Sequence, residues 1–423
     1  MKRILILALG SRGDVQPYIT LGHALRRAGH RVRMATFEMY EEMVREGGLE
    51  CLTIHGDAEG LLRAASQAGM LAGGNVLQTV AALQRSYGSL AASLPVDLSE
   101  SALRGTDLVL NQLPCNLFGW DIAEHLGIPH AVVSVIPLAR SRHRPLPGFP
   151  TGLSFLPSYN LLTFRLGEQI GWQMFRAAVN RWRVQVGLAP QPFFGIFERM
   201  QREQTPIING FSEQVIPRPS DWGSHIHMTG WWMPEDLEPD APAPGWAPPA
   251  DLQRFLAAGS PPVFIGFGSM PVRDPARTTA LILEAVRNAG QRAVLLAGWA
   301  GLGDNLPESV YPINYAPYSW LFPRMAAVIH HGGSGTTGYA LCSGVPSFVV
   351  RFGFDQGMWG SRSALLGVGP KPLLFQSLTS EKLAVHIREV AGSPAYRQSA
   401  AALGEKLRSE RGVLRAVDII ERL

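Results

Sequence analysis

The sequence has few cysteines, no long apolar run and little excess charge. Cys51, Cys115 and Cys342 are odd in number and far apart in 423 residues, which argues against a disulfide framework and predicts reduced thiols. The apolar segment after Met1 stops at Gly10, too short for the core of a signal peptide, and no run approaches the ~18–20 residues of a membrane span. We therefore expect a soluble, cytoplasmic protein, with peripheral membrane contact left open.

Several ligand classes are excluded by what is missing. A net charge of +4 is too small a basic excess to suggest nucleic-acid binding. No G-x-x-x-x-G-K-[ST] motif is present, and Gly10-Ser-Arg-Gly-Asp14 shares only one glycine spacing with the dinucleotide fingerprint. The sequence also lacks a D-x-D pair. We expect no metal ion and no bound cofactor.

What the sequence does contain is a regular alternation of strand and helix patterns. In the first half we predict strands over residues 2–9, 31–37, 52–54, 107–111, 130–137, 206–211 and 225–232, with a loop over 10–17 and helices over 18–28 and 117–126. In the second half we predict strands over 262–267, 293–297, 326–329 and 346–350, helices over 275–289, 361–366 and 380–391, and one long helical pattern over 396–423. This rhythm is typical of α/β proteins with parallel sheets.

The length and a proline-rich stretch predict two domains. Single cores stop growing near ~250–300 residues, and residues 233–250 hold six prolines beside acidic side chains, as in a semi-rigid linker. We expect an N-terminal domain over 1–232 and a C-terminal domain over 251–423. The last helix could pack back on the first domain.

Residues 139–204 interrupt the rhythm. A proline-rich loop leads into a helical pattern over 161–186 that is rich in aromatic residues. Such a stripe is more often core than ligand pocket, but segments inserted on a doubly wound sheet commonly line the ligand crevice. Phe149 and Trp172 are therefore candidate contacts for a substrate.

A glycine-rich turn is the strongest local signal. The strand ending at Ile329 runs into His330-His331-Gly-Gly-Ser-Gly-Thr-Thr337, where a helical pattern begins. The unpaired amides at a helix start and the positive end of its dipole attract anions, and glycines allow close approach. We interpret this turn as a diphosphate site.

Four motifs now occur in a recognisable order: Gly10-Ser-Arg-Gly-Asp-Val-Gln-Pro17, Phe267-Gly-Ser269, the turn after Ile329, and Asp355-Gln356. Together they resemble the GT-B glycosyltransferases of family 1, and in particular the bacterial and fungal sterol 3β-glucosyltransferases and antibiotic glycosyltransferases. The resemblance covers nearly the whole chain. It implies two Rossmann-like, doubly wound parallel-sheet domains that face a central cleft, with a nucleotide sugar on the second domain and an acceptor on the first.

The resemblance also implies roles for residues of the second domain. His331 would donate to the diphosphate of the sugar donor, a bond that strengthens as the leaving group gains charge. Asp355, 24 positions later, and Gln356 would bind sugar hydroxyls; the simpler alternative for Asp355 is a helix cap. Further donor contacts are expected from Gly268, Ser269, Gly333, Ser334, Gly335 and Thr336.

In the first domain the resemblance assigns Asp14 as the general base that takes the proton of the acceptor hydroxyl. A helix cap is the alternative for this residue too. Ser11 and Arg12 lie in the same loop and would shape the acceptor entrance.

The sequence departs from the family pattern beside the sugar-binding pair. Arg351 replaces the usual proline, Phe354 stands where the family has glycine before the aspartate, and Gly357-Met358 replaces Pro-Phe. Tyr339 occupies the position of a ribose-binding glutamate found in plant members. The identity of the sugar is therefore not implied by the resemblance.

These observations predict an inverting, metal-independent hexosyltransferase that moves glucose from UDP-glucose to an apolar alcohol such as a sterol, terpenoid or polyketide aglycone. Alternatives are an antibiotic or glycolipid glycosyltransferase that uses a dTDP-deoxysugar such as dTDP-rhamnose, an epimerase or hydrolase of the donor, and a non-catalytic partner that binds nucleotide sugars. The oligomeric state is not indicated.

Overall fold

The structure is a computed structural model that describes residues 1–55, 98–113, 118–234, 246–268, 270, 272, 274–296 and 306–423. The chain divides into two compact units. The first comprises Met1–Glu213, Pro217–Leu237 and Arg411–Leu423, and the second comprises Gln214–Ile216 and Glu238–Glu410. Most of the predicted linker, residues 235–245, lies outside the described residues.

The first unit is built on a seven-stranded parallel sheet in the order β3-β2-β1-β4-β5-β6-β7. β1 and β4 lie at the point where the strand order reverses, and their carboxyl ends therefore flank the natural ligand crevice of such a sheet. The strands are β1 (Arg3–Leu7), β2 (Arg31–Phe37), β3 (Glu50–Ile54), β4 (Leu108–Gln112), β5 (His130–Ser134), β6 (Ile207–Asn209) and β7 (Ile226–Met228).

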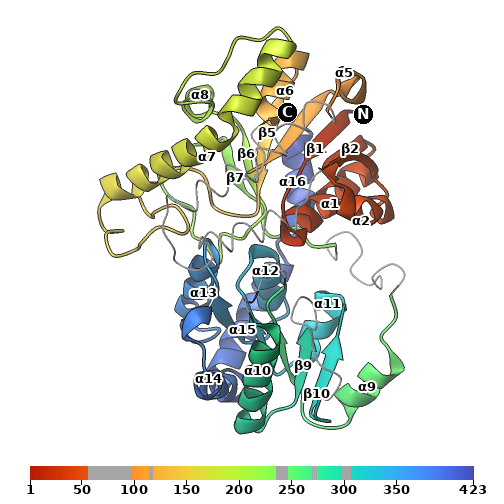
Figure 1. Ribbon diagram of the computed structural model, residues 1–423, viewed down its shortest axis with the longest axis vertical. Coiled ribbons are helices and arrows are strands. Elements are labelled where there is room, and N and C mark those ends of the chain that lie inside the picture. Colours follow the sequence, from red (N-terminus) through yellow and green to blue (C-terminus); the bar gives the residue numbers. More distant parts are fainter. Residues whose placement is uncertain are drawn as a thin grey trace. The chain divides into compact units, whose positions relative to one another are not determined.

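The helices of the first unit are α1 (Arg12–Arg27), α2 (Glu41–Glu46), α5 (Glu100–Leu103), α6 (Gly119–Leu126), α7 (Pro157–Gln185), α8 (Phe197–Glu203) and α16 (Gly412–Ile420). The 29 residues of α7 make it the longest of these, and its N-terminal half projects from the rest of its unit (Figure 1). In the described part of the chain, no helix is both long and apolar enough to cross a membrane.

Two predicted elements need correction. The first helix begins at Arg12, not at Tyr18, so Asp14 belongs to its first turn and the loop expected over residues 10–17 is much shorter. The long C-terminal helical pattern is two helices, α15 (Pro394–Arg408) and α16, because the chain turns at Arg411, whose φ is 51°. This break puts α15 in the second unit and α16 in the first.

The second unit repeats the doubly wound plan with a six-stranded sheet in the order β10-β9-β8-β11-β12-β13, and its strand pairs are parallel. Its strands are β8 (Val263–Gly266), β9 (Ala293–Leu296), β10 (Val310–Ile313), β11 (Ala327–His330), β12 (Ser347–Arg351) and β13 (Leu373–Leu374). Its helices are α9 (Ala250–Ala257), α10 (Pro275–Ala289), α11 (Tyr318–Leu321), α12 (Ser334–Cys342), α13 (Gln356–Leu365), α14 (Ser380–Gly392) and α15.

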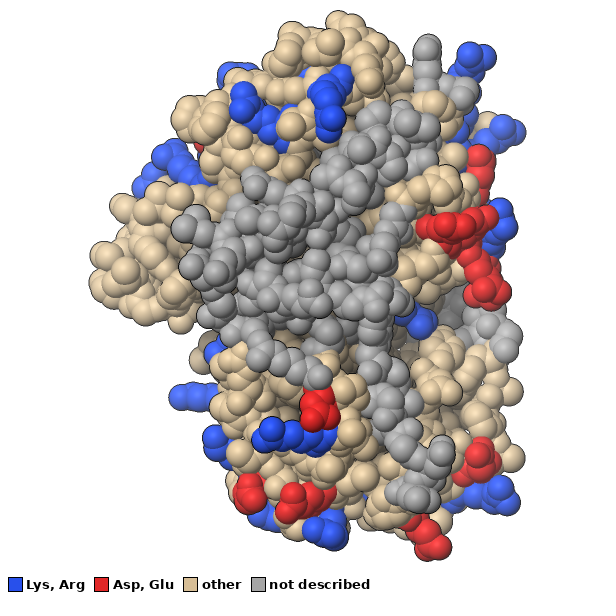
Figure 2. All heavy atoms as spheres, viewed as in Figure 1, with Lys and Arg blue, Asp and Glu red and all other residues tan. Residues whose placement is uncertain are grey.

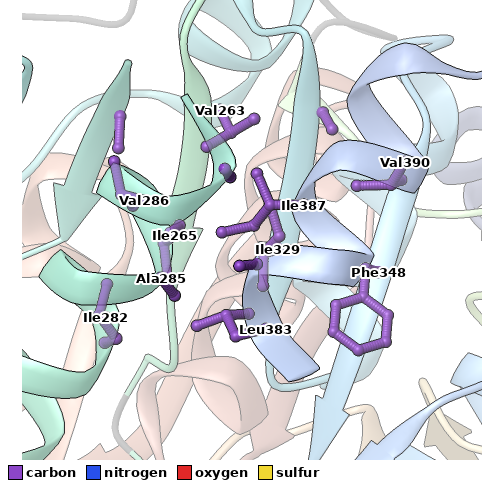
Figure 3. Close-up of a cluster of buried hydrophobic side chains, with 14 of the residues drawn as sticks. Val263, Ile265, Ile282, Ala285, Val286, Ile329, Phe348, Leu383, Ile387 and Val390 are labelled. Carbon is purple, nitrogen blue, oxygen red and sulfur yellow. The ribbon is translucent and has the colours of Figure 1, made fainter. Parts of the chain in front are cut away.

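Strand alternation divides the core of this unit between the two faces of its sheet. Val263, Ile265 and Ile329 point to one face, where side chains of α10 and α14 cover them (Figure 3). Phe264 and Val328, one residue out of step, join the core on the other face, which includes Leu321 and Ala340 of α11 and α12. Successive side chains of a strand point to opposite faces, and a sheet covered on both faces therefore needs continuous apolar strands.

Ile387 of α14 provides a test of this packing, since it is fully buried against the sheet. We expect Ile387→Ala to lower the free energy of unfolding by about 2–5 kcal/mol, because the removed atoms leave a cavity. Val385 on the same helix is 52% exposed, and Val385→Ala should change it by less than about 0.5 kcal/mol. Chemical denaturation would measure both. Equal losses would contradict the assigned face.

Candidate functional site

The two glycine loops predicted to bind a diphosphate meet at the switch point of the second sheet. Gly268 follows β8 and His331 follows β11, and these strands are neighbours in register, with His330 opposite Gly266. The order of strands reverses between them, because β9 follows β8 outward on one side and β12 follows β11 on the other. This is where doubly wound sheets bind ligands.

The start of α12 offers amides that the helix itself does not use. Gly333 is the N-cap and supplies no side-chain cap, while its carbonyl accepts bonds from both the amide and the hydroxyl of Thr337, each at 2.9 Å. The first amides of a helix have no partner within it. Gly335 and Thr336 are partly exposed in this first turn, and Ser334 is buried. A helix start with this geometry suits an anion.

His331 is held between two glycines. A Cβ on Gly333 would lie 2.5 Å from Nε2 of His331, and a Cβ on Gly268 would lie 2.9 Å from its Cε1. Gly268 also has a φ of 59°, a conformation that L side chains rarely adopt. Any other residue at either position would displace the imidazole. Ser269, the next predicted contact, lies outside the described residues.

The imidazole of His331 is neutral at pH 7. The atoms packed around it lower its pKa to about 4, because burial penalises the charged form. Its Nδ1 is enclosed and forms no hydrogen bond with the described residues. A neutral ring with an unsatisfied buried nitrogen can donate one hydrogen bond to a ligand and keep it oriented.

His330 has a different role from His331. Its Nδ1 accepts a bond of 3.1 Å from the amide of Gly332, and burial together with the neighbouring His331 lowers its pKa to about 3. The side chain is fully buried at the end of β11. It stabilises the turn from inside the sheet and is a structural histidine.

Asp355 and Gln356 begin α13 beside this turn. Asp355 occupies the N-cap position without a side-chain capping bond; its Oδ2 instead accepts a bond of 2.8 Å from the indole Nε1 of Trp359, which is fully buried. The capping role considered from the sequence is thus absent. The indole fixes the direction of the carboxylate.

Gln356 closes the loop that precedes it. Its Oε1 accepts the amides of Phe352 and Gly353 at 2.6 and 3.3 Å. These two donors fix the orientation of the amide group, so Nε2 points away from them, toward Sδ of Met270 at 3.1 Å. Only the NH₂ end of Gln356 is left to meet a sugar hydroxyl, as a donor. The side chain also ties this loop to the one after β8.

Phe354 adopts a backbone conformation that suits glycine. Its φ is 50°, which costs roughly 1 kcal/mol for a residue with a Cβ. This is the position at which the resembling family carries glycine before the aspartate. A glycine here would adopt this conformation without the steric cost, so Phe354 holds the loop at a cost in strain.

In the first unit, Asp14 stands in the first turn of α1, directly beyond β1. Its Oδ2 accepts the amide of Ser11 at 2.9 Å and the hydroxyl of Ser11 at 2.8 Å. Gly10, with a φ of 135°, brings the backbone so close that a Cβ there would lie 2.6 Å from Oδ2. Oδ1 takes no part in these bonds, so one oxygen anchors the carboxylate and the other is left for chemistry.

Burial raises the pKa of Asp14, and the bonds from Ser11 only partly offset this rise. A carboxylate with a raised pKa is a stronger base than an ordinary aspartate. The capping alternative and the catalytic hypothesis are both compatible with this geometry, because each uses a different oxygen.

The other predicted acceptor contacts fall in different environments. Arg12 is exposed and its Nε donates to Gln16 at 3.2 Å, and Phe149 is partly exposed in the loop before α7. Trp172 is fully buried, and its indole donates to the carbonyl of Pro192 at 3.2 Å. Trp172 therefore fills the core beneath α7 and offers no surface to a ligand.

Comparison with known proteins identifies the chain. Residues 4–142 match the glycosyltransferase family 28 N-terminal domain, and residues 293–421 match the erythromycin biosynthesis protein CIII-like C-terminal domain. The chain belongs to the GT-B glycosyltransferases. This confirms the resemblance stated from the motifs and the predicted fold.

Among curated relatives, a sterol 3-beta-glucosyltransferase of Cryptococcus neoformans is 33% identical over 446 aligned residues, which cover 99% of this chain and 27% of the relative. The chain thus spans about three tenths of the length of the curated relatives it matches. Among solved structures, the glycotransferase of kitacinnamycin superposes with a TM-score of 0.71 at 20% identity, covering 100% of this chain and 98% of that one.

A Streptomyces glycosyltransferase complexed with thymidine diphosphate gives a TM-score of 0.64 at 21% identity, with both chains covered completely. At these identities the solved structures show the fold alone.

Among the described residues, no group of three or more histidine, cysteine, aspartate or glutamate side chains is placed to hold a metal ion.

Three hydrogen bonds of the site were not predicted from the sequence. They are the bond from the indole of Trp359 to Asp355, the bond from the amide of Phe352 to Oε1 of Gln356, and the bond from Nε2 of Gln356 to Sδ of Met270. The first had a signal, since Trp359 lies four residues after Asp355 and such residues share a helix face. The contact between Gln356 and Met270 joins residues 86 positions apart, and no local pattern predicts it.

Gly332 and Gly335 allow a matched test of the turn. A Cβ on Gly332, whose φ is 89°, would lie 2.6 Å from Cγ1 of Val349 and 3.0 Å from the carbonyl oxygen of Gln356, whereas a Cβ on Gly335 would meet nothing within 4 Å. We expect Gly332→Ala to destabilise by at least about 1 kcal/mol. Gly335→Ala, inside α12, should be neutral or stabilise by up to about 1 kcal/mol. Thermal denaturation would measure both; an unaffected Gly332→Ala protein would contradict the tight packing of the turn.

Proposed function

We propose that the protein is an inverting glycosyltransferase that moves glucose from UDP-glucose to a hydroxyl of an apolar acceptor such as a sterol, terpenoid or polyketide aglycone. The observation that carries the proposal is the placement of His331 between Gly268 and Gly333, at the start of α12, with the start of α13 and its oriented Asp355 packed against the same turn. These groups suit the diphosphate and the sugar of one donor.

The donor half of the reaction needs stabilisation of a leaving diphosphate. The amides at the start of α12 and the N–H of His331 would donate to the phosphate oxygens, and these bonds strengthen as the C1–O bond breaks and charge develops. Asp355 and Nε2 of Gln356 would hold the sugar so that C1 is presented for attack. We propose that no metal ion and no cofactor are required, because the helix start supplies comparable charge stabilisation.

The acceptor half needs a base. The acceptor oxygen attacks C1 as its proton passes to Asp14, the bond from C1 to the diphosphate oxygen breaks, and UDP leaves. Attack opposite the leaving group turns an α-linked donor into a β-glycoside. The raised pKa of Asp14 and its single anchored oxygen support this role.

The choice of acceptor is supported by two observations. The curated relatives are named sterol 3-beta-glucosyltransferases, and the segment around α7 is rich in aromatic and aliphatic side chains. A dTDP-deoxysugar donor is the alternative, supported by the solved Streptomyces glycosyltransferase that is complexed with thymidine diphosphate. We also propose a cytoplasmic location for the protein, in keeping with Cys51 and Cys342, which form no disulfide in the described part of the chain.

A matrix of donors and acceptors would test the function. UDP-glucose and dTDP-sugars would be incubated with sterols, flavonoids and macrolide aglycones, and products read by mass spectrometry. Glucosylated sterol or aglycone supports the proposal, and transfer only from dTDP-sugars would replace the donor. Epimerised or hydrolysed donor without transfer, or tight donor binding without any product, would overturn the transferase.

Replacing Asp14 by Asn tests the base. The amide keeps the size and can still accept the bonds from Ser11, but it cannot take a proton. We expect turnover to fall by about 10²–10⁴-fold, with UDP binding by calorimetry unchanged. Asp107→Asn is a matched control, because that aspartate pairs with Arg3 at the amino end of β4. Near-normal turnover in the Asp14→Asn protein would refute the assignment.

The raised pKa of Asp14 predicts a pH dependence. The base works when deprotonated, so kcat/KM should rise with pH through a pKa above that of an ordinary aspartate. Ser11→Ala removes a hydrogen bond that favours the charged carboxylate of Asp14. The acid limb of the plot of kcat/KM against pH should therefore move to higher pH. The acid limb should stay in place if it reflects the titration of His331 instead of Asp14. Initial-rate profiles of the two proteins decide this.

A further inference from the structure

The outer face of α7 is unusually apolar. Of fourteen large hydrophobic residues that the described structure leaves exposed, nine lie between Leu153 and Phe194. Leu162, Leu166 and Ile170 recur every four residues along the N-terminal half of the helix and are 52%, 46% and 36% exposed. Residues four apart lie on the same helix face. Scattered exposed leucines need no explanation, but a continuous stripe of this kind marks an interaction surface.

The same helix also has an ordinary inward face. Phe164, Trp172, Phe175, Val179 and Trp182 are buried and are spaced by three, four or seven to eight residues, so they already anchor α7 to its unit. The outer stripe is therefore not needed to hold the helix in place. Its exposure is a property of the folded unit.

Aromatic residues extend the stripe on both sides. Phe155, 73% exposed, precedes the helix, and Phe194, 67% exposed, follows it in a loop that lies along α7. The side chains of Gln169 and Gln173 both donate to the carbonyl of Phe193, at 3.2 and 2.8 Å. We call Phe155, Leu162, Leu166, Ile170, Phe193 and Phe194 the α7 patch.

The loop before the helix is fixed in place. Asn160 donates to the carbonyls of Arg142 and Ser154, each at 2.8 Å, and Thr163 accepts the amide of Leu146 at 2.8 Å. Phe155 is thus presented by a braced turn. The patch is largely preformed and loses little conformational entropy when it binds.

The segment around the patch has a positive net charge. Residues 139–204 hold nine arginines and three glutamates, with no lysine or aspartate, so this segment carries +6 in a chain whose net charge is +4. All three glutamates are paired, Glu168 and Glu198 with Arg140 and Glu203 with Arg199. Six arginines form no ion pair within the described residues: Arg142, Arg144, Arg165, Arg176, Arg181 and Arg202. Of these, Arg144 donates from Nη1 to the carbonyl of Pro137 at 3.0 Å.

Figure 2 shows the visible surface over the projecting end of α7 free of charged side chains, with basic side chains beside it. A convex apolar face flanked by arginines is the pattern of helices that lie in the interface of a membrane with anionic lipids. We propose that the α7 patch docks on the surface of an anionic lipid bilayer, with Phe and Leu side chains in the acyl boundary and the unpaired arginines on the headgroups. The proposal needs no turnover and stands independently of the proposed reaction.

Vesicle sedimentation of the full chain tests it. The protein would be mixed with vesicles of phosphatidylcholine alone and with vesicles containing phosphatidylglycerol. We expect sedimentation with the anionic vesicles and weaker association as salt is raised, because screening reduces the contribution of the arginines. Absence of sedimentation with either vesicle would overturn the proposal.

Matched variants separate the patch from general stickiness. Leu162→Asp with Leu166→Asp should weaken binding by more than about tenfold, and Phe155→Ser alone should weaken it in the same direction. Val385→Asp, also at an exposed apolar position but on α14, should bind as the unmodified protein does. Arg165→Glu with Arg181→Glu should lose affinity mainly for anionic vesicles, whereas Arg287→Glu on α10 should not. Circular dichroism would verify folding.

Two other occupants give different results. A dimer seen by light scattering without lipid, and lost in the Leu162→Asp and Leu166→Asp protein, would assign the patch to a second copy. Loss of transfer to a water-soluble acceptor in that protein, with vesicle binding unchanged, would assign it to the acceptor site. Either result would overturn membrane docking.

Discussion

The site of the second unit depends on one close backbone contact. Gly332 lies so near the start of α13 that a single added carbon would meet the carbonyl of Gln356 and the side chain of Val349. The diphosphate turn and the sugar-binding pair are therefore packed as one body. Gln356 extends this body to the loop after β8 through Met270. A donor would meet a surface whose parts cannot shift separately, which is the condition for preorganised electrostatic stabilisation.

Burial acts on the two proposed catalytic groups in the same physical way and with opposite chemical results. It disfavours the charged form of each, which raises the pKa of Asp14 and lowers that of His331. The aspartate becomes a better base, and the histidine stays a neutral donor that does not have to lose a proton. Burial is the largest influence on the pKa of each group, and the hydrogen bonds from Ser11 only moderate it at Asp14. Neither group has an oppositely charged partner within hydrogen-bonding distance in the described residues.

The sequence predicted elements well where local signals agreed. Strand Arg31–Phe37 and helix Pro275–Ala289 fall at the expected residues, the latter between a capping Asp274 and the left-handed Gly290. The start of α1 was missed because glycine and proline in Gly10–Pro17 look like a loop, whereas the bonds of Ser11 to Asp14 nucleate a helix there. The break at Arg411 has only Gly412 as a signal. The roles of Gln356 Oε1 and Trp359 depend on the folded arrangement of the loop, and Trp172 shows that an aromatic residue in a promising segment can simply be core.

The return of α16 to the first unit has a consequence for the order in which the protein is made. This helix packs against α1, and Glu421 beyond its end bonds to His30 and, through its carbonyl, to Lys2. These partners lie about four hundred residues apart in the chain. During synthesis, the side of α1 that α16 covers stays exposed until the whole second unit has been synthesised. The N-terminal unit is therefore synthesised first but completed last. Its helix α16 can pack against α1 only after the second unit has left the ribosome.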